Sequence, residues 1–172
     1  MNKSILALIF SMFLAAPMFA ADLGGRVISI GSDTTYPPHE FIEDGVVKGF
    51  DVDVVAAICE RINCVPNWVT TAWDGIFPAL ADGQFDMVVS GVTITEERDK
   101  IVDFSDPYII VQQGILMRVS DKGATIDDFI SGAMKLASQN GTTNAALGEE
   151  LVGRDNLALF DSFNNAVIAV QN

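Results

Sequence analysis

The chain has 172 residues, of which 49% are hydrophobic and 19% charged, and this composition excludes a disordered tail and fits one globular domain or two small ones. The 23 acidic and 10 basic residues give a net charge of −13, which disfavours a nucleic-acid partner because little positive charge is available to neutralise phosphates. No run of like charges occurs, so we expect the acidity to form a dispersed, solvated surface.

Residues 1–21 are typical of a signal peptide. Lys3 precedes an apolar segment, residues 5–16, and Pro17, Ala20 and Ala21 follow it. We expect cleavage and export to the periplasm. The alternative is an uncleaved anchor of about 17 residues, which would be short for a bilayer span.

The remaining sequence alternates segments with the periods of strands and helices, which predicts an α/β fold. Strands are expected at 27–31, in a hairpin around the turn 43–45, and at 65–69, 87–89, 134–137 and 157–160. Helices are expected at 51–63, 76–80, 126–130 and 144–152, and from 166 onward with Ser162 as the N-cap. The apolar run 108–117 contains no residues typical of helix starts or ends, which suggests a segment that crosses between two lobes.

The two cysteines, Cys59 and Cys64, lie five positions apart. In an exported protein this spacing favours a disulfide, and two independent thiols are the alternative. No His, Asp or Glu pattern accompanies the cysteines, so the sequence predicts no metal site.

Residues 87–108 combine a short apolar strand, the small residues Ser90, Gly91 and Thr93, and a charged turn that carries Arg98. Small residues at the end of a strand leave backbone groups free beside a crevice, and a guanidinium can hold a carboxylate with two hydrogen bonds. The alternative is the start of a surface helix, with Thr95 as its N-cap and Arg98 solvated.

Three stretches carry recognisable motifs: Gly-Phe-Asp-Val-Asp-Val from Gly49, Ser-Gly-Val-Thr-Ile-Thr from Ser90 with Arg98 beyond it, and Gly141-Thr142-Thr143. Together they resemble the family 3 bacterial extracellular solute-binding proteins, the periplasmic amino-acid-binding components of ABC transporters. The resemblance implies a type II periplasmic-binding-protein fold, in which crossover strands join two α/β lobes. We expect the first lobe at 22–112 and part of the second at 113–172, because members of this family continue for several tens of residues and the chain looks truncated at its C-terminus.

The resemblance also implies that an amino acid binds in the cleft between the lobes. Arg98 would hold the α-carboxylate, with help from Thr93 and from Thr142 and Thr143 at the start of a helix. Oxygens at Ser90, Gly91 and Thr93 would accept the α-ammonium, Tyr36 and Trp73 would enclose the side chain, and Asp33 would contact its far end.

Several of these residues have a structural alternative. Tyr36 and Trp73 could be core aromatics, Asp33 could brace the loop of Tyr36, and Thr142 could act only as an N-cap. The single histidine, His39, is interpreted as a loop residue and not as a ligand.

The leading hypothesis is a monomeric, non-enzymatic protein without cofactor that captures a polar amino acid and delivers it to an inner-membrane ABC permease. One alternative is a periplasmic lyase resembling cyclohexadienyl dehydratase, with Asp33 or Glu40 as its general acid. Another is the sensor domain of a receptor.

Overall fold

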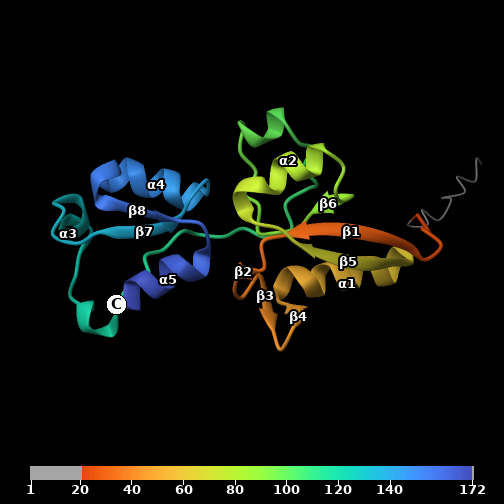
Figure 1. Ribbon diagram of the computed structural model, residues 1–172, viewed down its shortest axis with the longest axis horizontal. Coiled ribbons are helices and arrows are strands. Elements are labelled where there is room, and N and C mark those ends of the chain that lie inside the picture. Colours follow the sequence, from red (N-terminus) through yellow and green to blue (C-terminus); the bar gives the residue numbers. More distant parts are fainter. Residues whose placement is uncertain (1–20, 172) are drawn as a thin grey trace, which may run out of the picture.

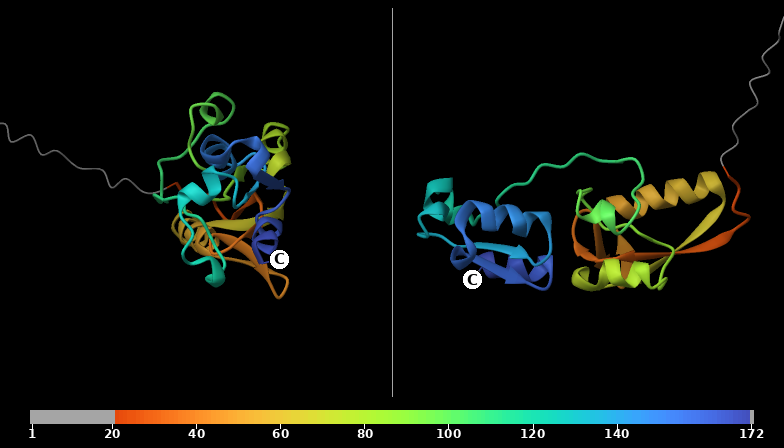
Figure 2. Two further views of the ribbon diagram at one scale, coloured as in Figure 1. Left: turned by 90° about the vertical axis from the view of Figure 1, so that its left-hand side faces the viewer. Right: turned by 90° about the horizontal axis from the view of Figure 1, so that it is seen from above.

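The computed structural model describes residues 21–171. The predicted signal peptide, residues 1–21, lies outside the described part except for its last residue. Two α/β lobes lie side by side (Figures 1 and 2). The first lobe contains the elements between residues 26 and 88, and the second contains those between residues 126 and 171. This arrangement confirms the two-lobe α/β fold, whereas the boundary at residues 112 and 113 stays a prediction.

The first lobe is built on a parallel sheet of β1 (Arg26–Ser32), β5 (Cys64–Thr70) and β6 (Met87–Val88), in the order β5-β1-β6. Two helices, α1 (Phe50–Ile62) and α2 (Ile76–Ala81), cover opposite faces of this sheet (Figure 1). Ile30 of β1 is fully buried against the α1 side, and Ile76 of α2 is fully buried on the other side. Pro66 fits within β5 because this strand lies at the edge of the sheet, where a missing N–H is tolerated.

A small antiparallel sheet of β2 (Thr35–Tyr36), β3 (Glu40–Glu43) and β4 (Val46–Lys48) projects from the first lobe. Its turn has positive φ values at Asp44 and Gly45, as a tight hairpin requires, which confirms the predicted hairpin. Tyr36, the last residue of β2, faces the second lobe, where its ring contacts Phe163.

The predicted disulfide is present. Cys59 near the end of α1 is bonded to Cys64 at the start of β5, and the intervening chain turns at Asn63, which has a left-handed conformation.

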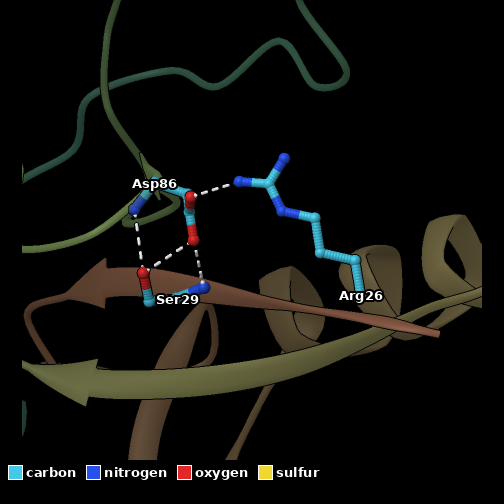
Figure 3. A network of polar contacts seen from close by, with 3 residues as sticks. All are labelled: Arg26, Ser29 and Asp86. Atoms are coloured by element: carbon cyan, nitrogen blue, oxygen red, sulfur yellow. Dashed lines mark hydrogen bonds and ion pairs between the residues drawn. The ribbon is translucent and has the colours of Figure 1, made fainter. Parts of the chain in front are cut away.

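A polar network fixes β6 to β1 (Figure 3). The backbone N–H and the hydroxyl of Ser29 each donate to Asp86 Oδ2 at 2.8 Å, and Arg26 donates to Asp86 Oδ1 at 2.7 Å. The hydrogen bonds from Ser29, followed by the charge of Arg26, lower the pKa of Asp86. The start of β6 is thereby held in register beside the middle of β1.

The second lobe has a two-stranded parallel sheet, β7 (Leu136–Gln139) and β8 (Leu157–Phe160). Helices α4 (Thr143–Val152) and α5 (Phe163–Gln171) lie on opposite sides of it, and α3 (Ile126–Ile130) lies beside α4 (Figure 1). The predicted bounds of β7 were wrong: residues 134–137 were expected, but Met134 packs on the Phe129 core and the strand continues to the polar Gln139. Helix α5 begins at Phe163, earlier than the expected residue 166, and Ser162 accepts a hydrogen bond from the N–H of Asn165.

The chain passes from the first lobe to the second through residues 101–118, to which the structure assigns neither helix nor strand. This segment crosses between the lobes, as predicted for residues 108–117, and it is drawn in green to turquoise in Figure 2. It is largely exposed, with Ile110 at 93%. Single 3-10 turns occur at Trp73–Gly75, Arg98–Lys100, Val119–Asp121 and Arg154–Asn156. Among the described helices, none has the length and apolar character needed to cross a bilayer.

Candidate functional site in the interlobe cleft

The carboxyl ends of β1, β6 and β7 all point toward the boundary between the lobes, which is where open parallel sheets commonly bind ligands. The residues that follow these strands line one cleft of about 1320 Å³. This cleft includes all nine predicted ligand-binding residues: Asp33, Tyr36, Trp73, Ser90, Gly91, Thr93, Arg98, Thr142 and Thr143. Residues more than 100 positions apart in the sequence are therefore brought to a common site.

Arg98 is half-buried and turned into the cleft. Its guanidinium carbon lies 5.2 Å from the ring centroid of Trp73 and 5.4 Å from that of Phe77, a geometry suited to cation–π attraction. It donates to the carbonyl of Thr93 at 2.9 Å and to that of Gly141, in the other lobe, at 3.3 Å. Thr95 accepts a hydrogen bond from the N–H of Arg98, so the expected cap of a short turn coexists with an inward-facing guanidinium. Burial lowers the pKa of Arg98.

The two predicted aromatic residues differ in their surroundings. Trp73 is only 7% exposed and belongs to the core cluster of Ile76, yet its indole N–H donates to the carbonyl of Gly141 across the cleft at 3.0 Å. Tyr36 stacks on His39 and meets Phe163 of the second lobe edge-on, with ring centroids 4.7 Å apart. Both aromatics thus contribute to contacts between the lobes.

Asp33 is 5% exposed and fully hydrogen-bonded. Its backbone N–H donates to the Ser90 hydroxyl at 2.9 Å, and its carboxylate accepts from Thr35 at 2.8 Å and from Gln139 of the second lobe at 2.6 Å. The bond to Thr35 matches the expected brace of this loop. Sequence reasoning missed Gln139, which was placed in a loop; its polarity at a predicted strand end was the only available signal.

Ser90 and Gly91 are held by two buried acids of the first lobe. The hydroxyl of Ser90 donates to Glu40 at 2.7 Å, and the N–H of Gly91 donates to Asp51 at 2.8 Å. Because Ser90 also accepts from Asp33, its hydroxyl is committed within the protein. Gly91 has φ near +51°, and a Cβ there would lie 3.2 Å from the Tyr36 ring, so a side chain at this position would crowd the cleft.

The second-lobe threonines begin α4. Thr142 is its N-cap: the hydroxyl accepts from the N–H of Ala145 at 3.1 Å and donates to the carbonyl of Gln139 at 2.7 Å. Thr143 lies opposite Thr93, with hydroxyl oxygens 3.4 Å apart across the cleft. The positive end of a ten-residue helix therefore faces Arg98, and both features favour an anion.

Comparisons with known proteins agree with this architecture. The family model for bacterial extracellular solute-binding proteins, family 3, matches residues 28–172. A probable histidine-binding protein of Neisseria gonorrhoeae is 34% identical over 151 residues, which are 86% of this chain and 56% of the relative. An arginine-binding periplasmic protein of Mannheimia haemolytica is 32% identical over 173 residues, which are 100% of this chain and 67% of the relative. The chain thus spans about half to two thirds of the length of these relatives.

Solved structures show the same fold. An ancestral amino-acid-binding protein, described as a precursor of cyclohexadienyl dehydratase, has a TM-score of 0.77 and 37% identity, covering 84% of this chain and 66% of that one. A lysine complex of a putative ABC-transporter binding component from Wolinella succinogenes has a TM-score of 0.73 and 31% identity, covering 85% of this chain and 64% of that one. The chain belongs to the family 3 bacterial extracellular solute-binding proteins.

Proposed function

We propose that this protein binds a cationic amino acid in the interlobe cleft and delivers it, as a periplasmic monomer, to an ABC permease in the inner membrane. The observation that carries the proposal is the buried carboxylate of Asp33, whose two hydrogen-bond donors, Thr35 and Gln139, are both neutral. A buried anion without a cation is costly, and a ligand's positive side chain would neutralise it.

The rest of the cleft supports a zwitterionic ligand. Arg98 and the N-terminus of α4 offer donors for the α-carboxylate, with Thr93, Thr142 and Thr143 around them. Carbonyls at Ser90 and Gly91 and the oxygens of Thr93 would receive the α-ammonium, and Tyr36 and Trp73 would enclose the side chain. Relatives named as arginine- or histidine-binding proteins, and a neighbour solved with lysine, favour the cationic class.

The proposal is tested by the substitution Asp33→Asn, which keeps the shape of the side chain and removes its charge. Calorimetric titration of the wild type is expected to show tighter binding of arginine, lysine or histidine than of glutamine. Asp33→Asn should weaken binding of the cationic ligand by roughly tenfold or more, since a hydrogen bond between two charged groups is about twice as strong as a neutral one.

Asp82→Asn is the matched control, because Asp82 is an exposed acid at the end of α2. It should leave every affinity unchanged. Unaltered arginine affinity in Asp33→Asn, or a wild type that binds leucine as tightly as arginine, would refute the assignment.

The lyase alternative has one observation in its favour, the likeness to an ancestral precursor of cyclohexadienyl dehydratase. Of the two expected acids, however, Glu40 has no exposed surface and accepts a hydrogen bond from Ser90. Asp33 is 5% exposed, and its carboxylate accepts from Thr35 and Gln139. We therefore propose a binding function without catalysis. Incubation with prephenate should leave its absorbance unchanged, and substrate turnover would overturn this part of the proposal.

A further inference from the structure

Three side chains behind Tyr36 converge on one point in the first lobe. One ring nitrogen of His39, one carboxylate oxygen of Glu40 and one of Asp51 all lie within 4.8 Å of one another. His39 Nδ1 is 3.7 Å from Asp51 Oδ1. Glu40 and Asp51 have no exposed surface, and the exposed fraction of the His39 side chain is 15%.

Each of the three residues has one buried side-chain atom without a hydrogen-bond partner within residues 21–171. These atoms are His39 Nδ1, Glu40 Oε2 and Asp51 Oδ1. The other oxygen of each carboxylate is occupied: Glu40 Oε1 accepts from the Ser90 hydroxyl, and Asp51 Oδ2 accepts from the Gly91 N–H. Each acid is thus oriented by one donor and directs its second oxygen toward the same small space, which is how outer hydrogen bonds orient metal ligands.

The backbone holds the three residues in this arrangement. The N–H of Phe50 donates to the carbonyl of Pro38, and that of Asp51 donates to the carbonyl of His39, both at 3.0 Å. These bonds bring the β2–β3 connection against the start of α1. Gly49 permits the contact, because a Cβ at this position would lie 2.2 Å from the His39 carbonyl oxygen. These backbone contacts place the three residues beside one another.

Two buried carboxylates side by side require a compensating positive charge. A proton is one solution, and burial is the main cause that raises the pKa of Glu40 to about 9. A divalent cation is a second solution, and it would bind all three side chains at once.

We propose that His39, Glu40 and Asp51 form a binding site for one zinc ion. One imidazole with two carboxylates is a donor set that zinc accepts, and three protein ligands leave a fourth position for water. Bonds of about 2.0–2.2 Å in a tetrahedral site place ligand atoms roughly 3.4 Å apart. The 3.7 Å pair already approaches that spacing, and the others, at most 4.8 Å apart, need to close by about 1.4 Å at most. His39, whose side chain is 15% exposed, also lines the cleft, which gives the ion a route of entry.

The test uses the full chain without a histidine tag, stripped with EDTA and dialysed against zinc chloride. Elemental analysis is expected to find one zinc per chain, and the thermal midpoint should rise with zinc because the ion binds the folded state. Cobalt(II) in place of zinc should give the visible absorption of a four-coordinate site. Wild-type protein that retains no stoichiometric zinc overturns the proposal, whatever the variants do.

Two variants separate this site from surface binding. His39→Phe removes the ligand nitrogen and retains a ring to stack on Tyr36, so it should lose zinc affinity by more than about 100-fold and abolish the cobalt spectrum. Asp53→Asn removes an exposed acid of α1 two positions from Asp51 and should change neither. Equal zinc binding by wild type and folded His39→Phe would overturn the assignment. Arginine binding is measured separately, so failure of the zinc site leaves the proposed function untouched.

Discussion

The buried carboxyl of Glu40 makes the stability of the protein depend on pH in a direction opposite to that of most acids. Its pKa is raised from 4.5 to about 9, first by burial and then by the nearby charges of Asp51 and Asp33. Between these two values the folded state keeps a proton that the unfolded chain releases. Stability that is present at low pH is therefore lost as the pH rises through this window.

The expected size of the effect follows from the two pKa values. The slope is about 1.4 kcal/mol per pH unit, so at pH 7 the group costs roughly 3 kcal/mol relative to its protonated form. Glu40→Gln removes this ionisation. The Gln oxygen can still accept from Ser90, and its amide N–H can donate to the unpaired oxygen of Asp51. The variant is expected to gain stability over the wild type as the pH increases.

The assay is urea unfolding at pH 5, 6, 7 and 8, with EDTA present so that no metal contributes. The difference in unfolding free energy, variant minus wild type, should rise by about 1.4 kcal/mol per unit. Glu43→Gln is the matched control from the same strand, because Glu43 is exposed, and Lys48 lowers its pKa. The difference in unfolding free energy between Glu43→Gln and the wild type should not change with pH above pH 5. A flat difference for Glu40→Gln as well would refute the reasoning.

Three further predictions concern the cleft and the frame around it. Arg98→Ala should weaken amino-acid binding by about 3 kcal/mol, as expected for a charge pair broken inside a closed cleft, and unchanged affinity by calorimetry would remove Arg98 from the site. Reduction of the disulfide between Cys59 and Cys64 should lower unfolding free energy by about 2 kcal/mol, since its loop is short, and an unmoved urea midpoint would contradict this. Thr142→Ala should cost about 1 kcal/mol of stability through loss of the cap to Ala145, with Thr142→Ser restoring most of it in thermal unfolding.

Hydrophobic periodicity located the elements well where one face is buried. The predicted helix 126–130 and strand 157–160 have the observed bounds, because Phe129 and Leu157 supply clear core positions. Strand β7 was misplaced because its last residues are polar. The side chain of Gln139 is buried by a contact with Asp33 of the other lobe, and a local pattern carries no information about a partner 106 positions away.

The nine proposed ligand contacts were assigned through the family resemblance, which short motifs along the chain carry, and they stay predictions. The cluster of His39, Glu40 and Asp51 was not predicted from the sequence. The sequence placed Asp51 only at the start of the expected helix 51–63, and His39 in a loop, yet the structure buries Asp51 fully beside His39 and Glu40. Their convergence depends on the close backbone contact at Gly49, which a sequence pattern shows only as a glycine before a helix.

The amide of Gln139 already donates a hydrogen bond to the Asp33 carboxylate, so it competes with any ligand group for that carboxylate. Any ligand group that reaches Asp33 must replace an amide donor held at 2.6 Å. A cationic side chain can exceed that interaction, whereas an apolar one would leave the carboxylate with fewer partners than it has in the empty protein. Under the proposed function, Gln139 would therefore favour cationic over apolar side chains at Asp33.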